Sequence, residues 1–111
     1  MGRTEQTPAS RREQAQLGVL RLDRVLHALS DPVRLAIVVQ LHHEGESSCA
    51  ALDGGRPKST MSHHFRVLRE AGVVRTTVHG VTHMNHLCRE PLDDAFPGVL
   101  DSIIAAAVRM G

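Results

Sequence analysis

Residues Lys58 to Val74 read KSTMSHHFRVLREAGVV. The apolar residues of this segment recur at helical spacing, at Met61, Phe65 and Leu68. This spacing gives a helix one apolar stripe that faces inward. Ser59 is the predicted N-cap, because its side-chain oxygen can accept a hydrogen bond from a first-turn amide. The helix is expected to run through Glu70, with Gly72 at its C-terminal cap.

A short helix is expected just before this one, over Ser47 to Leu52. The two are separated by Asp53-Gly54-Gly55-Arg56-Pro57, a turn-forming cluster that cannot continue a helix. Two short helices joined by a tight turn form a helix-turn-helix, and its second helix can enter the major groove of DNA.

Two more helices are predicted upstream. The first carries an amphipathic stripe made of Leu22, Val25, Leu26 and Leu29. The second runs from Pro32 to about His43, with Ser30 or Asp31 as its N-cap. Its apolar residues cover most of its circumference, which predicts the central helix of the core.

Downstream, Val73 to Val78 and Val81 to Leu87 are β-prone and predict a hairpin that turns at His79-Gly80. Glu90-Pro91 and Pro97-Gly98 are expected to break the chain before a last helix. The predicted fold class is therefore mainly α with a small β-hairpin, a winged helix-turn-helix.

The chain has 111 residues, of which 41% are hydrophobic and 23% charged, as in one small globular domain. Residues 1–16 are polar and are predicted to be a flexible arm, and residues 17–111 a DNA-binding and dimerisation domain. With no apolar run of about 18 residues and no export signal, we expect a cytoplasmic protein without a membrane partner. Its two cysteines are expected to be reduced thiols.

The net charge of +1 conceals an uneven distribution. Residues 54–89 hold six bases and one acid, a net charge of +5, whereas the remainder holds seven bases and eleven acids. The six bases are Arg56, Lys58, Arg66, Arg69, Arg75 and Arg89. Such a concentration favours a face that binds a polyanion.

The last helix has an apolar stripe that a domain of this size cannot easily bury together with that of the first helix. Exposed apolar patches of this kind usually mark interfaces. We therefore predict a two-fold homodimer through the first and last helices, with contacts from Leu22, Val25, Leu26, Leu100, Ile103, Ile104, Ala107 and Val108.

The segments ALSDPVRLAIVVQL, Ala28 to Leu41, and KSTMSHHFRVLREAGVV, followed by a hairpin, together resemble the ArsR/SmtB family of winged-helix repressors. The resemblance covers about Leu22 to Met110. It implies a homodimer that binds a palindromic operator, usually represses its own operon, and dissociates when an inducer, often a metal ion, binds.

The outer face of the Ser59–Glu70 helix predicts how DNA would be read. Thr60, Ser62 and His63 are short enough to meet base edges, and Arg66 can reach a base or a phosphate. Phosphate contacts are predicted for Arg56, Lys58, Ser59, Arg75 and His79. Arg69 belongs to the same polar face of the helix, and the alternative for His79 is a plain solvent-exposed turn. His64 is instead expected to be packed and hydrogen-bonded.

No metal site is predicted, and a transition-metal ion is the one cofactor left open. His86 and Cys88 share a strand face and are the only local pair with ligand spacing. The resemblance argues against the familiar sites: the family motif E-L-C-V-C-D-L is replaced by Glu46-Ser-Ser-Cys-Ala-Ala-Leu52, and the last helix has no histidine. The inducer, a metal ion or a small molecule, stays undetermined.

An enzyme is not expected, because the chain has no phosphate loop, carboxylate pair or nucleophile elbow. The predicted function is a sequence-specific DNA-binding transcriptional regulator, a repressor released by an inducer. Two other functions remain open: a metal-responsive repressor with a non-standard site, and a winged-helix adaptor that binds protein rather than DNA. Operator sequence, regulated genes and the sign of regulation are not set by these patterns.

Overall fold

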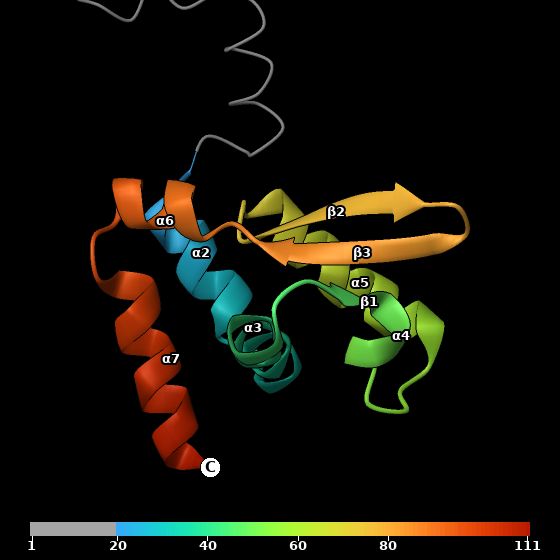
Figure 1. Ribbon diagram of the computed structural model, residues 1–111. Coiled ribbons are helices and arrows are strands. Elements are labelled where there is room, and N and C mark those ends of the chain that lie inside the picture. Colours follow the sequence, from blue (N-terminus) through green and yellow to red (C-terminus); the bar gives the residue numbers. More distant parts are fainter. Residues whose placement is uncertain (1–19) are drawn as a thin grey trace, which may run out of the picture.

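The computed structural model describes residues 20–111. The predicted arm, residues 1–16, lies outside them. In chain order the elements are α2 (Leu22–Leu29), α3 (Pro32–Glu44), β1 (Ser47–Ser48), α4 (Cys49–Leu52), α5 (Lys58–Glu70), β2 (Val74–His79), β3 (Thr82–Leu87), α6 (Arg89–Ala95) and α7 (Val99–Met110). Figure 1 shows the hairpin β2–β3 extending from one side of the helical body, and α7 at the opposite side. The predicted winged helix-turn-helix is confirmed.

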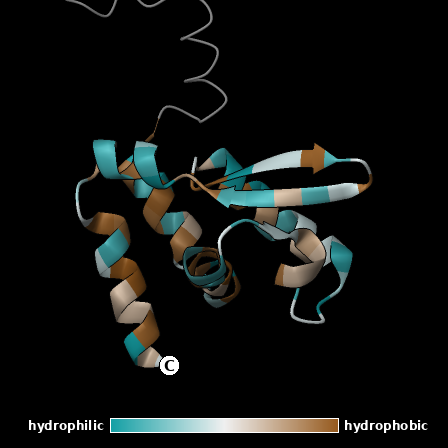
Figure 2. Ribbon diagram, in the orientation of Figure 1, coloured by the Kyte–Doolittle hydropathy of each residue, from teal (hydrophilic) through white to brown (hydrophobic). Residues whose placement is uncertain are grey.

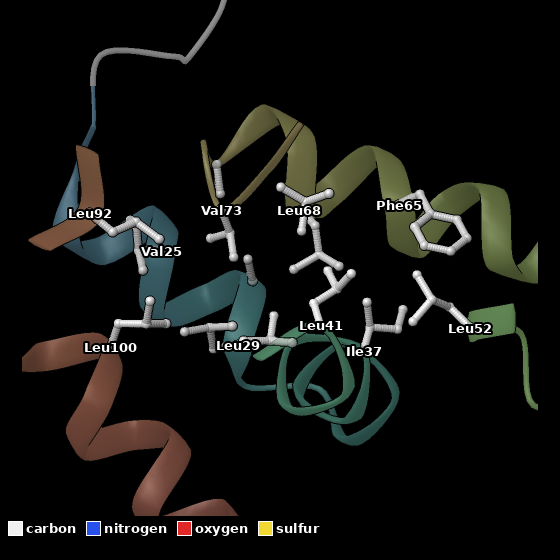
Figure 3. Packing of buried hydrophobic residues seen from close by; sticks show 14 of the residues in the cluster. Val25, Leu29, Ile37, Leu41, Leu52, Phe65, Leu68, Val73, Leu92 and Leu100 are labelled. Atoms are coloured by element: carbon white, nitrogen blue, oxygen red, sulfur yellow. The ribbon is translucent and has the colours of Figure 1, made fainter. Parts of the chain in front are cut away.

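The core lies between α5 and α3. Leu68 and Phe65 of α5 point toward Leu41 and Ile37 of α3 (Figure 3). At the other end, Leu92 of α6 meets residues of α2 and α7. Because α3 contacts α2, α5, α7 and β3, it is the central helix that its apolar composition predicted.

Helix α3 begins at the predicted cap. The Asp31 carboxylate accepts hydrogen bonds from the amides of Val33 at 2.8 Å and Arg34 at 3.2 Å, and Pro32 occupies the first turn. Burial alone would raise the pKa of Asp31, but these amide hydrogen bonds outweigh it and hold the pKa below its ordinary value. Ionised Asp31 therefore stabilises the folded chain.

Replacing Asp31 with alanine is expected to lower the free energy of unfolding by about 1 kcal/mol at pH 7. The pKa of Asp31 is lower in the folded state, so its contribution is complete above the unfolded value of about 3.9 and declines as pH falls through the folded pKa. Urea denaturation at pH 7 and at pH 3 tests this: the difference between Asp31→Ala and the wild type should shrink in acid. Asp31→Ser, which keeps a cap without a titrating group, should lose less at pH 7.

The end of α5 also follows the prediction. Gly72 has φ +80°, and the amides of Gly72 and Val73 donate to the carbonyls of Arg69 and Leu68 at 3.0 Å each. These are the two bonds of a Schellman motif, and the positive φ is the reason for glycine. The chain then continues directly into the hairpin of β2 and β3, which is the wing of the fold.

Four local predictions are corrected. Ser47 and Ser48 are strand β1 rather than helix, because they pair with Met84 and Asn85 of β3. The N-cap of α5 is Pro57, whose carbonyl accepts from the amide of Met61, so Ser59 lies inside the helix. Glu90-Pro91 does not break the chain but begins α6, because proline fits a first helical turn.

The fourth correction concerns the wing. His79 pairs with Thr82, so the two-residue turn is Gly80-Val81 rather than His79-Gly80. Gly80, at φ +65°, occupies the first central position, where hairpin turns favour glycine. The sheet order is β1-β3-β2, with both pairs antiparallel.

None of the helices in residues 20–111 has both the length and the apolarity that crossing a membrane requires.

Candidate DNA-binding face

All ten residues predicted to contact DNA are exposed. They are Arg56, Lys58, Ser59, Thr60, Ser62, His63, Arg66, Arg69, Arg75 and His79. Seven of them lie on α5, where burial of Met61, Phe65 and Leu68 on the inner side leaves the polar residues outside. Arg56 precedes this helix, and Arg75 and His79 belong to β2. One helix and the adjoining strand thus carry four exposed cations, Lys58, Arg66, Arg69 and Arg75.

These cations are not neutralised within the described part of the chain. No carboxylate there lies within 4.0 Å of Lys58, Arg66 or Arg69, nor of Arg56 or Arg75. The Arg56 guanidinium makes only a 3.4 Å contact to the Asp53 carbonyl. Unpaired exposed cations retain their attraction for a polyanion, and phosphate binding would release the counterions of DNA.

Arg89 differs from the other five bases of residues 54–89 because it is paired with carboxylates. Its guanidinium lies 2.8 Å from Asp101 and 3.6 Å from Asp93, and it donates to His42 Nδ1 at 2.7 Å. Arg89 therefore joins α6 to α7 and α3, and it does not contribute to the candidate DNA-binding face.

The wing is held to the body by a buried asparagine that the sequence analysis did not single out. Asn85, fully buried on β3, accepts from Thr76 Oγ1 at 2.7 Å and donates to the Ser47 carbonyl at 3.4 Å and Cys49 Sγ at 3.2 Å. These bonds connect both wing strands to β1 and α4. A lone asparagine at an inward position of an alternating strand was the signal available.

Among the described residues, His86 and Cys88 are not joined by a third metal-ligating side chain. Both ring nitrogens of His86 have partners, Glu46 at 3.2 Å and Thr77 at 3.0 Å. Burial raises the pKa of the Cys88 thiol, although Arg75 acts in the opposite direction, and a neutral thiol is a poor metal ligand. Within residues 20–111 no three His, Cys, Asp or Glu side chains are placed to share a metal ion.

The predicted dimer contacts divide into two groups. Val25, Leu100 and Ile104 are buried within this chain, so their assignment to the interface is corrected: they pack in the core beside α6. Leu22, Leu26 and Val108 are 42%, 45% and 48% exposed, and Ile103 and Ala107 are half-buried. Hydrophobic segments recur along α7 in Figure 2. An exposed apolar strip thus remains on α2 and α7.

His64 is packed as predicted. Only 8% of it is exposed, and its Nδ1 lies 3.3 Å from a guanidinium nitrogen of Arg34. Arg34 itself was missed. Its spacing from Ile37, Val38 and Leu41 places it on the buried stripe of α3, and that spacing was the available signal.

Similarity to known proteins also indicates a helix-turn-helix transcriptional regulator. A helix-turn-helix domain family matches residues 29–77. An uncharacterized HTH-type transcriptional regulator of Bacillus subtilis (strain 168), YceK, is 35% identical over 83 residues, which cover 72% of this chain and 83% of that protein.

Two solved structures share the fold. The transcriptional repressor BigR from Xylella fastidiosa matches with a TM-score of 0.63 at 26% identity, over 95% of this chain and 96% of its own. An ArsR family transcriptional regulator matches with a TM-score of 0.61 at 21% identity, over 80% of this chain and 93% of its own. Family and fold are those of regulators rather than enzymes, as expected. The chain belongs to the HTH-type transcriptional regulators and has the winged helix-turn-helix fold of an ArsR family regulator.

Proposed function

We propose that the chain is a repressor that binds a palindromic DNA operator as a homodimer and is released by an inducer. The observation that carries the proposal is the set of exposed cations without carboxylate partners on α5 and at its flanks, at Arg56, Lys58, Arg66, Arg69 and Arg75. A protein-binding adaptor has no need for such a concentration of charge on and beside α5, the recognition helix of this proposal.

In this proposal the N-terminal half of α5 enters the major groove. Thr60, Ser62 and His63 face base edges, and Arg66 contacts a base or a phosphate. Phosphates are held by Ser59 and by the cations around it, Arg56, Lys58 and Arg69. Arg75 and His79 bring the wing to the adjacent backbone.

Dimerisation would use the exposed strip of α2 and α7: Leu22, Leu26, Ile103, Ala107 and Val108. Helix α7, which carries three residues of the strip, and the wing lie at opposite sides of the chain (Figure 1). A two-fold axis through the strip would therefore leave both recognition helices free, and a spacing of roughly 34–36 Å would match successive turns of the major groove.

Repression would follow from occupation of a promoter by this dimer, and the name of BigR as a transcriptional repressor supports that sign of regulation. An inducer would act by binding better to a subunit arrangement that does not fit the operator, since only differential affinity shifts a population.

Selection from a pool of random 30-base-pair duplexes tests the proposal. The expected product is an inverted repeat whose half-site centres lie about 10–11 base pairs apart, bound by two protomers in sedimentation experiments. Enrichment of single, unrepeated sites would contradict the dimeric operator complex. Failure to enrich any sequence would favour the adaptor.

A further inference from the structure

Arg34 is a buried cation without a carboxylate partner. It is 7% exposed, and no carboxylate in residues 20–111 lies within 4.0 Å of its guanidinium. Its hydrogen bonds go elsewhere: Nε donates to the Ala28 carbonyl at 2.7 Å, and Nη2 to the His27 carbonyl at 3.3 Å. Nη1 lies 3.3 Å from His64 Nδ1.

The acceptors explain how the charge is tolerated. A buried guanidinium is costly unless its donors are satisfied. Ala28 and His27 are in the last turn of α2, where the backbone carbonyls give the helix end a partial negative charge. The His27 carbonyl also accepts from the amide of Ser30 at 3.1 Å and from its hydroxyl at 2.7 Å. The carbonyl end of α2 thus takes the place of a carboxylate, and Asp31, the N-cap of α3, adds a negative charge nearby.

The same guanidinium contacts His64. Arginine can only donate, so the 3.3 Å contact between Nη1 and Nδ1 is a hydrogen bond in the tautomer of His64 whose Nδ1 carries no proton. Asp31 Oδ1 is 3.9 Å from the same Nδ1, and the His63 ring centroid is 5.7 Å from that of His64. One arginine side chain on α3 therefore joins the end of α2 to the middle of α5.

The contacts of Arg34 with the end of α2 and with His64 form a junction between α2 and α5. The place of His64 on α5 connects this junction with the proposed DNA face. His64 follows His63 and precedes Arg66 by two residues, both on the proposed DNA face, while its own side chain points inward. A rotation of α5 about its axis would move both faces together. Helix α2 carries Leu22 and Leu26 of the proposed dimer strip, so the junction also connects the interface with the recognition helix.

We infer that Arg34 and His64 are positioning residues, which orient the recognition helix relative to α2 and so determine discrimination of the operator from other DNA. The inference rests on the proposed function, because orientation matters only to a helix that reads a groove. It differs from a general stabilising role: a misoriented helix keeps its phosphate contacts but loses base contacts, so specific binding falls more than non-specific binding.

Matched substitutions at His64 test the inference. His64→Leu removes the acceptor at similar size, whereas His64→Asn places an amide oxygen near the position of Nδ1. With His64→Leu, affinity for the selected operator should fall about tenfold, while affinity for a scrambled duplex of equal length changes less than about twofold. His64→Asn should stay within about threefold of the wild type for both duplexes.

Arg34→Lys provides a second measurement that does not depend on the folding of His64→Leu. Lysine keeps the charge but not the planar set of donors that reaches three acceptors, so the ratio of specific to non-specific affinity should again fall. Melting temperature and sedimentation are recorded for each variant. Equal loss on both duplexes, or full operator affinity in His64→Leu or Arg34→Lys, would overturn the inference. Absence of an operator preference in the wild type would instead overturn the proposed function.

Discussion

Replacing Lys58 and Arg66 together with alanine is expected to weaken operator binding at least about a hundredfold and to leave the fold and the proposed dimer intact. Both side chains are exposed and have no carboxylate within 4.0 Å in the described part of the chain. Their removal therefore costs the folded protein little, as is usual for surface substitutions. The proposed dimer would lose four cations from its proposed DNA interface at once.

The salt dependence of binding separates the roles of the two residues. If both contact phosphates, four contacts are lost per dimer, and the slope of log K against log salt decreases in magnitude by about 3.6. If Arg66 contacts a base edge instead, the slope decreases by about 1.8 and sequence preference relaxes at one position of each half-site. Fluorescence anisotropy over a salt series measures both quantities.

A control variant must remove the same charge from another surface. Arg21→Ala with Arg24→Ala does so at the N-cap and in the first turn of α2, where both side chains are exposed and Arg21 pairs with Asp23 at 3.0 Å, and it should change operator affinity by less than about threefold. An equal loss in the control would mean that only net charge matters. Unchanged affinity in the Lys58/Arg66 variant would support the adaptor function, in which DNA is not a partner.

Local sequence signals predicted α5 well because the signals themselves are local. The apolar spacing of Met61, Phe65 and Leu68 and the glycine after the helix are readable within a few turns. Strand β1 could not be found in this way. It has two residues, and its partner Asn85 lies 38 residues away in sequence, so only tertiary pairing makes it a strand. The contact between Arg34 and His64 is non-local in the same sense.

The sequence placed three core residues, Val25, Leu100 and Ile104, in the dimer interface, and the missing helix α6 explains two of them. Glu90-Pro91 predicts a break in the chain, so α6 was missing from the fold expected from the sequence. Leu92 of that helix packs with Val25 and Leu100 (Figure 3), and these two residues were therefore counted as surface. An amphipathic stripe indicates that a helix side is covered, but not whether the cover comes from the same chain or from a partner.

The residues left exposed identify the right variant for testing dimerisation. Leu26→Asp combined with Val108→Asp is expected to dissociate the proposed dimer. Two-fold symmetry doubles the two substitutions, so the dimer would bury four unpaired carboxylates in an apolar interface. Both side chains are nearly half exposed in the protomer, so the monomer should fold. Ile104→Asp would be unsuitable, because Ile104 is 4% exposed and its substitution would disrupt the core.

Sedimentation equilibrium should show a monomer for Leu26→Asp/Val108→Asp at concentrations where the wild type is a dimer, and operator affinity should fall at least about a hundredfold because each half-site is then bound alone. Ala36→Asp with Ala95→Asp adds the same charge at exposed positions of α3 and α6 and should remain dimeric. A Leu26→Asp/Val108→Asp protein that stays dimeric would place the interface elsewhere. A monomer with wild-type operator affinity would show that one recognition helix suffices, and the palindromic complex would have to be abandoned.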